Sequence, residues 1–214
     1  FITSTLQQSA STRLGFNVKR TMRVAQKLYE GGLITYMRTD APSLSKESIN
    51  EARKYVNENL GNNYLTNSPR IYSGSENAQE AHEAIRPTDP KKTPDLLKNE
   101  LNHDQFELYT LIWKRTLASQ MENWSGMRTT VLINNQDNNI RFRASGTVTV
   151  FEGFRALYEE GRTEENEEPQ NLPKLLKDST LATIKVDTNQ HFTKPPPRFS
   201  EASLVKSLEE KGIG

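Results

Sequence analysis

Residues 18–40 read VKRTMRVAQKLYEGGLITYMRTD. The first thirteen predict a helix over 18–30, because apolar side chains recur three or four positions apart on one face: Val18, Met22, Ala25 and Tyr29. Asn17 can cap the start of this helix, and Gly31-Gly32 ends it. Residues 32–40 then predict a short extended segment that leads to the next helix.

Similar helical patterns continue on both sides of this segment. The spacing of apolar residues, with capping residues and glycine stops, predicts further helices at 6–14, 46–60, 76–86 and 103–121. The helix at 76–86 has to stop near Arg86, because Pro87 follows it. Residues 1–122 therefore read as a helical domain.

The pattern changes to strands after Trp124. Alternating and β-branched residues predict strands at 129–133, 140–144, 147–151, 181–186 and 190–193. A last helix is expected after Ser200, behind the rigid run Pro195-Pro196-Pro197. The fold class is therefore α+β and multidomain. The few strands of 123–193 make an incomplete sheet, which implies missing strands upstream or a partner.

The composition excludes several classes of protein. The 214 residues include no cysteine, which excludes disulfides, thiol nucleophiles and cysteine-bound metals in this chain. Three histidines and no cysteine offer few ligands for a transition-metal site, and no phosphate-binding G-x-x-x-x-G-K-[ST] loop occurs. No apolar run is long enough to span a membrane. The net charge is +1, but six glutamates lie within 159–168, so the rest of the chain has an excess of lysine and arginine. This balance is compatible with a polyanionic partner.

Tyr36 and Arg38 lie two residues apart in the 32–40 segment. A phenol is a poor nucleophile at its ordinary pKa of about 10. A neighbouring guanidinium stabilises a phenolate and can also clamp a phosphate through paired hydrogen bonds. The pair therefore suits tyrosyl attack on a phosphodiester. The alternative is structural, with the tyrosine packed at a strand end and Arg38 paired to Asp40.

A second cluster surrounds His82 and Arg86. On the expected helix these two side chains are neighbours four positions apart, and together they would suit a backbone phosphate. The alternative is an ordinary surface ion pair between Glu83 and Arg86.

Four stretches carry a resemblance to a known family. They are FITSTLQQSASTRLGF (1–16), GLITYMRTD (32–40), AQEAHEAIRPTD (78–89) and PPRFSEASLVKSLEEKGIG (196–214). Each is similar to a signature stretch of the bacterial type IA DNA topoisomerases, and they occur in the same order. The resemblance covers essentially the whole chain and favours the functional interpretation of both clusters.

The resemblance implies an ATP-independent isomerase that relaxes negatively supercoiled DNA. Such an enzyme cuts one DNA strand by tyrosine attack, holds a 5′-phosphotyrosine link, passes another strand and reseals the cut. Tyr36 would be the nucleophile and Arg38 would neutralise the scissile phosphate. His82 would contact the DNA backbone. The remaining positions implied in DNA binding, or in orienting the nucleophile, are Gln26, Glu30, Thr35, Thr39, Asp40, Arg86, Arg198 and Ser200.

The family's toroid also implies a domain plan. Residues 1–122 would be a winged-helix-like domain that carries the tyrosine, and 123–193 would be part of a β-rich arch. Residues 194–214 would begin the single-strand-binding domain. The family's Mg²⁺-binding Toprim domain would lie upstream, so we expect Mg²⁺ in the intact enzyme, no metal site in this fragment, and no relaxation of DNA by the fragment alone.

The expected partners are a single-stranded region of negatively supercoiled DNA and the missing Toprim domain, with no membrane. The expected location is the cytoplasm, at the nucleoid. Other interpretations stay open at this point. The chain could be a single-stranded DNA-binding module without chemistry, or a structural gate with no affinity for DNA. Within the family, the enzyme could decatenate DNA or act on RNA instead of relaxing supercoils.

Overall fold

The computed structural model describes residues 1–73, 82–135, 139–158, 172–173 and 175–213. The chain divides into two compact units. The first unit contains Phe1–Ser125, Phe151–Arg162 and Phe199–Gly214, and the second contains Gly126–Val150 and Thr163–Arg198.

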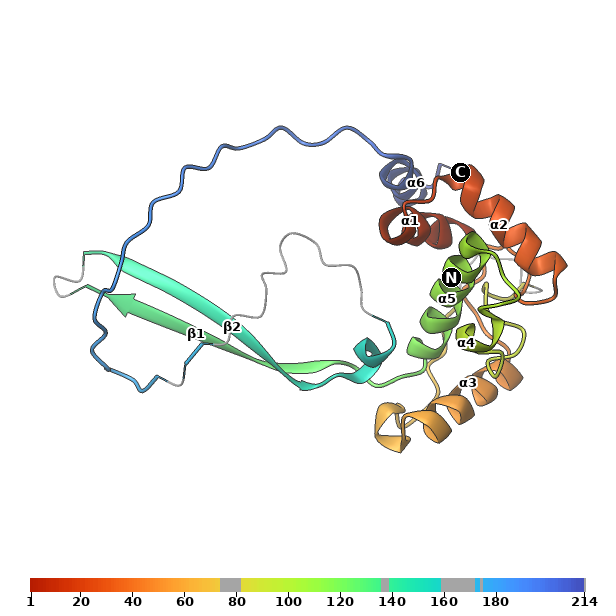
Figure 1. Ribbon diagram of the computed structural model, residues 1–214, viewed down its shortest axis with the longest axis horizontal. Helices are drawn as coiled ribbons and strands as arrows, with labels where there is room; N and C mark the ends of the chain where they lie inside the picture. Colours follow the sequence, from red (N-terminus) through yellow and green to blue (C-terminus); the bar gives the residue numbers. More distant parts are fainter. Residues whose placement is uncertain (74–81, 136–138, 159–171, 174, 214) are drawn as a thin grey trace. The chain divides into compact units, whose positions relative to one another are not determined.

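The first unit is built from helices. They are α1 (Thr3–Leu14), α2 (Val18–Glu30), α3 (Lys46–Asn59), α4 (Pro94–Leu97), α5 (His103–Ala118) and α6 (Glu201–Glu210), with 3₁₀ turns η1 (Asn62–Tyr64) and η2 (Gly153–Ala156). Helix α5 packs against α1, α2, α3 and α4, while α6 packs against α1 (Figure 1). The predicted helices at 18–30, 46–60 and 103–121 are confirmed, the last two ending at Asn59 and Ala118.

The core of the first unit forms around α5. Leu108, Tyr109, Ile112 and Leu117 of this helix are fully buried. The helices around it each contribute an aliphatic side chain that is also fully buried, namely Leu6 of α1, Leu28 of α2 and Val56 of α3. Removing such a side chain from water contributes about 1.5–3 kcal/mol. The core therefore fixes the helices whose ends carry the candidate site.

Capping explains why the helix boundaries could be predicted. The Asn17 side chain accepts a hydrogen bond from the Arg20 amide at 2.7 Å, which satisfies a free donor of the first turn of α2. Asn102 and Gln105 form the predicted capping box at the start of α5. Gly15 ends α1 in the left-handed conformation, at φ 66°.

The buried face of α2 differs from the prediction. Its buried residues are Thr21, Val24, Ala25 and Leu28. Tyr29, which was predicted to share the apolar stripe, is 42% exposed. The helix is thus rotated relative to the predicted face, because the core around α5 accommodates Val24 and Leu28. This rotation leaves the ring of Tyr29 at the surface.

The predicted helix at 76–86 is wrong for its described part. Residues 76–81 lie outside the described residues, and 82–86 form no helix. Their backbone groups bond to other segments instead: the Ala84 amide donates to the Ser43 carbonyl, and the Ile85 amide donates to the Phe1 carbonyl, both at 2.8 Å. These partners lie far away in the sequence, so the local pattern could not reveal them.

The second unit holds most of a two-stranded sheet, in which β1 (Ser125–Asn134) pairs with β2 (Arg141–Phe151) (Figure 1). The strands predicted at 140–144 and 147–151 are one continuous strand. Those predicted at 181–186 and 190–193 are wrong, since the structure assigns no strand there and Ile184 is 98% exposed. A strand requires a partner for its backbone, and within the described residues the sheet contains only β1 and β2.

The helix expected after Ser200 is confirmed as α6. Ser200 caps it by accepting a hydrogen bond from the Ser203 amide at 3.2 Å. Glu209 accepts hydrogen bonds from Ser4 and Gln8 of α1, at 2.8 and 3.1 Å. The two ends of the first unit's sequence are therefore joined through α1 and α6.

Candidate active site

The candidate site is the extended segment that follows α2. Burial alternates along it: Met37, Thr39 and Ala41 are buried, whereas Tyr36, Arg38 and Asp40 are exposed. The inward residues anchor the segment to the core. The Tyr36 side chain is 44% exposed, which leaves its phenol accessible to a macromolecule. Thr39, predicted to help orient the nucleophile, faces inward, and its hydroxyl accepts from the Ala41 amide at 3.1 Å.

Residues 84–88 support the segment from one side. The Thr35 amide donates to the Arg86 carbonyl at 2.9 Å, and the Thr88 amide donates to the Leu33 carbonyl at 3.0 Å. The Thr35 hydroxyl donates to the Ala84 carbonyl at 2.8 Å and accepts from the Arg86 amide at 3.0 Å. An antiparallel bridge joins Ile34 to Pro87. The backbone just before Tyr36 is therefore fixed by a segment about fifty residues away in the sequence.

Thr3, at the start of α1, supports the segment from the other end. Its hydroxyl lies 3.0 Å from the carbonyl oxygens of Met37 and Thr39 and accepts from the Thr39 amide at 2.9 Å. Its own amide donates to the Thr39 carbonyl at 2.9 Å. One residue thus binds the peptide groups on both sides of Arg38.

Replacing Thr3 by valine is expected to lower the free energy of unfolding of the first unit by about 1–3 kcal/mol. The substitution keeps the size of the side chain but leaves the part-buried Met37 carbonyl and Thr39 amide without their side-chain partner. Urea unfolding followed by tryptophan fluorescence measures the change, because Trp113 is buried in this unit.

Thr12→Val is the matched control, because the Thr12 hydroxyl is exposed and its one hydrogen bond among the described residues is within α1, to the Gln8 carbonyl. We expect its effect to stay within about 0.5 kcal/mol. Equal losses in the two variants would contradict the role given to Thr3.

The exposed side of the segment carries the ring of Tyr36 and the guanidinium of Arg38. The Tyr36 ring meets that of Tyr29 edge to face, with 5.3 Å between the centroids and 68° between the planes. No ion pair joins Arg38 to Asp40, both of which are described residues. The structural alternative expected an ion pair between Arg38 and Asp40, and this pair is not formed. The Arg38 charge therefore remains available for an anion.

Arg86 is bound within its own loop. Its guanidinium contacts the Glu83 carboxylate at 2.7 and 2.8 Å and donates to the Pro87 carbonyl at 3.0 Å, and its side chain is 15% exposed. This ion pair is the one that the structural alternative expected. His82 is half-buried, and its carbonyl accepts from the Ser43 hydroxyl at 3.5 Å. Because 82–86 form no helix, His82 and Arg86 are not neighbours on a helical face.

The other predicted positions are dispersed. Gln26 donates to Glu30 at 2.8 Å on the exposed side of α2, the helix that leads into the segment. Ser200 uses its hydroxyl to cap α6. Arg198 belongs to the second unit. The structure thus brings Thr35, Tyr36, Arg38, Thr39 and Asp40 together with the 82–88 loop.

Three residues near the site escaped the sequence analysis. Tyr29 was assigned to a buried stripe, Thr3 was given no role although it lies in the signature stretch 1–16, and Glu83 was considered only as an alternative partner of Arg86. The spacing of Tyr29 from the Gly31-Gly32 turn could have signalled that it sits beside the segment. Nothing local signals the role of Thr3, because its partners are more than thirty residues away.

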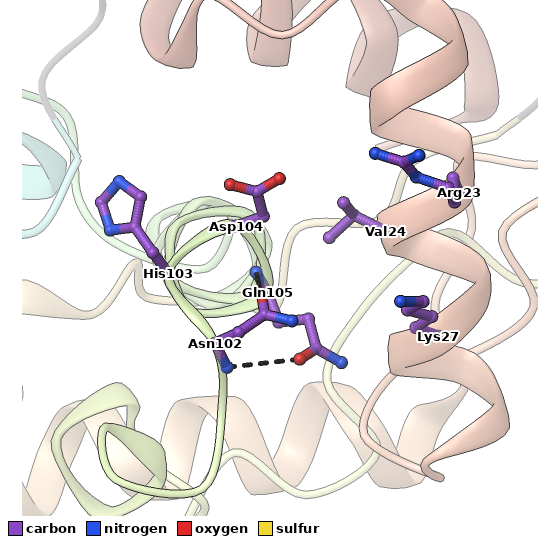
Figure 2. Close-up of a pocket in the computed structure, with 7 residues that line it drawn as sticks. All are labelled: Arg23, Val24, Lys27, Asn102, His103, Asp104 and Gln105. Atoms are coloured by element: carbon purple, nitrogen blue, oxygen red, sulfur yellow. Dashed lines mark hydrogen bonds between the residues drawn. The ribbon is translucent and has the colours of Figure 1, made fainter.

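A separate hollow of about 460 Å³ lies between α2 and the start of α5. Figure 2 shows Arg23, Val24 and Lys27 on α2 facing the first residues of α5, where the Asn102 amide donates to the Gln105 side chain. None of the seven described residues that line it is a predicted site residue. Asp104 of this hollow binds Arg20 through two hydrogen bonds of 2.7 and 2.9 Å.

The Arg20–Asp104 pair predicts an acid-sensitive contribution to stability. The hydrogen bonds from Arg20 hold the pKa of the Asp104 carboxyl below its usual range, and the Arg20 charge adds to this effect. A carboxyl with a lowered folded-state pKa stabilises the fold above its unfolded pKa of about 3.9, and that contribution is lost as the pH falls through the folded pKa.

Arg20→Gln is therefore expected to lower the free energy of unfolding of the first unit at pH 7. The difference in this free energy between the variant and the parent should shrink as the pH falls below about 4. Urea unfolding of both proteins at a series of pH values measures the difference. A difference in the free energy of unfolding that grew as the pH fell would contradict the lowered pKa of Asp104 as its cause. Lys54→Gln is the control, because Lys54 pairs with Glu58 across an exposed helix face at 3.8 Å.

Among the described residues, no group of three or more histidine, cysteine, aspartate or glutamate side chains could hold a metal ion. No helix among those residues is long and apolar enough to cross a membrane.

Comparisons with known proteins agree on one family. The family model described as DNA topoisomerase matches residues 1–214. DNA topoisomerase 1 of Rickettsia felis is 51% identical over 224 residues, which cover 100% of this chain and 29% of that protein. DNA topoisomerase 1 of Haemophilus influenzae is 48% identical over 215 residues, with 100% and 24% covered.

A solved structure is also similar. Full-length topoisomerase I from Thermotoga maritima matches with a TM-score of 0.75 and 35% identity, covering 100% of this chain and 35% of that one. Its similarity supports the mixed α+β fold. The chain thus spans about 29% of the length of the first curated relatives that it matches.

Proposed function

The chain belongs to the DNA topoisomerase family, and we propose that it supplies the tyrosine that cuts and holds one DNA strand. The observation that carries this proposal is the exposure of Tyr36 beside the Arg38 guanidinium on a segment bonded at both ends. A nucleophile has to reach a bulky backbone phosphate while its own backbone stays fixed. The segment meets both requirements.

The proposed chemistry is a transesterification. The Tyr36 phenolic oxygen attacks the phosphorus of a DNA phosphodiester, and the bond from phosphorus to the 3′ oxygen breaks. The phenolic proton is given up, and the departing 3′ oxygen takes up a proton to become a hydroxyl. The 5′ phosphate stays joined to Tyr36. Attack by the 3′ hydroxyl reverses these steps, so the energy of the phosphodiester is kept and no ATP is consumed.

Arg38 stabilises the charge in this reaction. Negative charge builds on the phosphate oxygens as the phenol attacks, and a guanidinium can bind two of those oxygens at once. Because no ion pair to Asp40 occupies it, Arg38 is free to turn toward the phosphate. Its position two residues after Tyr36, with both flanking peptides held by Thr3, sets where that phosphate would lie.

We propose supporting roles for the other predicted positions. His82 and, in the second unit, Arg198 contact the DNA backbone, and Ser200 lies where the single strand binds. Thr35 and Thr39 fix the segment through their hydroxyls, while Arg86 stiffens the supporting loop through Glu83. Gln26 and Glu30, which bond to each other on α2, and Asp40, two residues after Arg38, would help to orient the nucleophile.

The activity proposed for the whole protein is strand passage through the cut, which relaxes negatively supercoiled DNA. We propose that 1–122 act as the tyrosine domain, 123–193 as part of the arch and 194–214 as the start of the single-strand-binding domain. A Toprim domain of the same protein would hold Mg²⁺. The described residues of this chain offer no cluster of ligands for that ion, so the reaction steps given above do not involve it. With DNA as the substrate, the protein would act at the nucleoid in the cytoplasm.

Covalent trapping tests the proposal. The full-length protein is incubated with Mg²⁺ and a single-stranded oligonucleotide, the reaction is stopped with detergent, and label that migrates with protein is measured. A label at the 3′ end should be captured, because that part of the strand carries the 5′ phosphate. A label at the 5′ end should not be captured. Absence of an adduct, with DNA still bound, would instead favour a binding module without chemistry.

A further inference from the structure

The contact between Tyr29 and Tyr36 joins the end of α2 to the candidate nucleophile. Their ring centroids lie 5.3 Å apart and their planes meet at 68°, an edge-to-face arrangement. Both side chains are more than two-fifths exposed, at 42% and 44%. The two rings are therefore not part of the hydrophobic core, and core packing does not explain their contact.

The position of the Tyr29 ring is set by well-anchored backbone. Its neighbour Leu28 is fully buried in the core, and the Leu28 carbonyl accepts from the Leu33 amide at 2.9 Å. The Tyr29 carbonyl accepts from the Gly32 amide at 2.8 Å. Gly32 has a φ of 68°, the left-handed conformation that glycine adopts without strain. The turn that reverses the chain after α2 therefore fixes where Tyr29 stands.

The Tyr36 side chain has fewer restraints than its backbone. The bonds made by Thr35 and Thr3 hold the peptides on either side of it. Within the described part of the chain, no hydrogen bond to the Tyr36 hydroxyl is formed, and its aromatic contact is with Tyr29. An exposed side chain without such a contact exchanges between rotamers and aims its reactive atom in several directions.

We propose that Tyr29 is a positioning residue for the cleavage reaction: its ring restrains the Tyr36 ring so that the phenolic oxygen is aimed at the scissile phosphate. This role rests on the proposed function of Tyr36. An aromatic edge contact biases rotamers only modestly, but small misplacement of a reacting atom is costly. Loss of the ring should therefore slow adduct formation by about tenfold.

The test compares Tyr29→Ala with Tyr29→Phe in the full-length protein. Adduct formation is followed in a single turnover at saturating single-stranded DNA, and DNA affinity is measured by fluorescence anisotropy. The alanine variant should form the adduct about tenfold more slowly, with its affinity for DNA changed less than twofold. The phenylalanine variant keeps the ring and should react at the parental rate. Tyr72→Ala is the control, since Tyr72 is a tyrosine of similar exposure, 39%, outside the site.

A second measurement does not depend on the reaction. In protein labelled with fluorotyrosine, the Tyr36 fluorine signal is identified by its absence in Tyr36→Phe. Tyr29→Ala should shift this signal toward the position of free fluorotyrosine and narrow it, whereas Tyr29→Phe should not. An unchanged signal in the alanine variant would overturn the proposal even if no adduct formed in any protein.

The outcomes separate this proposal from the proposed function. An adduct that persists in Tyr36→Phe would refute the nucleophile and, with it, the role of Tyr29 in positioning that nucleophile, whatever the fluorine signal shows of the contact between the two rings. A parental rate in Tyr29→Ala, with adduct lost in Tyr36→Phe, would refute only the positioning role. Equal slowing in Tyr29→Ala and Tyr29→Phe would also refute it, because the hydroxyl and not the ring would then matter.

Discussion

Tyr36→Phe is expected to abolish the protein–DNA adduct and, in the full-length protein, relaxation of supercoiled DNA. The substitution removes the one atom that the proposed chemistry requires, the phenolic oxygen that bonds to phosphorus. The aromatic ring remains, so its contact with Tyr29 can persist. Covalent trapping with a 3′-labelled oligonucleotide measures the effect, and the signal should fall to background.

The same variant should fold and bind DNA as the parent does. Within the described residues the Tyr36 hydroxyl has no hydrogen-bond partner to lose, so the melting temperature should be unchanged. Tyr72→Phe is the matched control, because it also removes a tyrosine hydroxyl, one that donates to the Ser119 carbonyl at 3.0 Å. Adduct at the parental level in Tyr36→Phe would eliminate this tyrosine as the nucleophile.

Arg38→Ala is expected to slow adduct formation by about 10²–10³-fold at saturating DNA, the range seen when one charge-stabilising donor is removed from an active site. The guanidinium acts most strongly when charge builds on the phosphate, so the rate should suffer more than the affinity. Arg38→Lys restores a positive charge but not the paired donors, and we expect only partial recovery. Single-turnover trapping across a range of DNA concentrations separates rate from affinity.

Arg23→Ala is the control for the loss of a positive charge. Arg23 is an exposed arginine of α2 that lines the hollow in Figure 2, and no role in the reaction is assigned to it. Removing it can weaken phosphate binding in a salt-dependent way, but the rate at saturating DNA should not change. If Arg38→Ala behaved in the same way, Arg38 would be a binding residue and not a stabiliser of the reaction.

The helices could be predicted because their signals are local. An apolar period and a capping residue lie within one segment, as at Asn17 for α2 and Asn102 for α5. The buried face of α2 was predicted wrongly, because which side of that helix is buried depends on the core around α5 and not on the sequence of α2 alone. Tyr29 reached the surface for that reason, next to Tyr36.

Segments that depend on distant partners could not be predicted. The helix expected through His82–Arg86 gave way to a loop, because Phe1, Thr35 and Ser43 provide the hydrogen-bond partners of its backbone. The strands expected at 181–186 and 190–193 have a β-like composition but no neighbouring strand among the described residues. A single segment cannot reveal whether a partner for its backbone exists.

The sequence by itself determined the helices α1, α2, α3, α5 and α6, the extended segment between α2 and α3, and the placement of a tyrosine and an arginine two residues apart on that segment. Only the tertiary structure decided that Tyr36 and Arg38 face outward, that Arg86 is paired with Glu83, and that Thr3 and residues 84–88 hold the segment at both ends. The physical reason is the range of the interactions. Capping and helical periodicity act within a few residues, whereas burial and backbone pairing depend on segments that folding brings together from far along the chain.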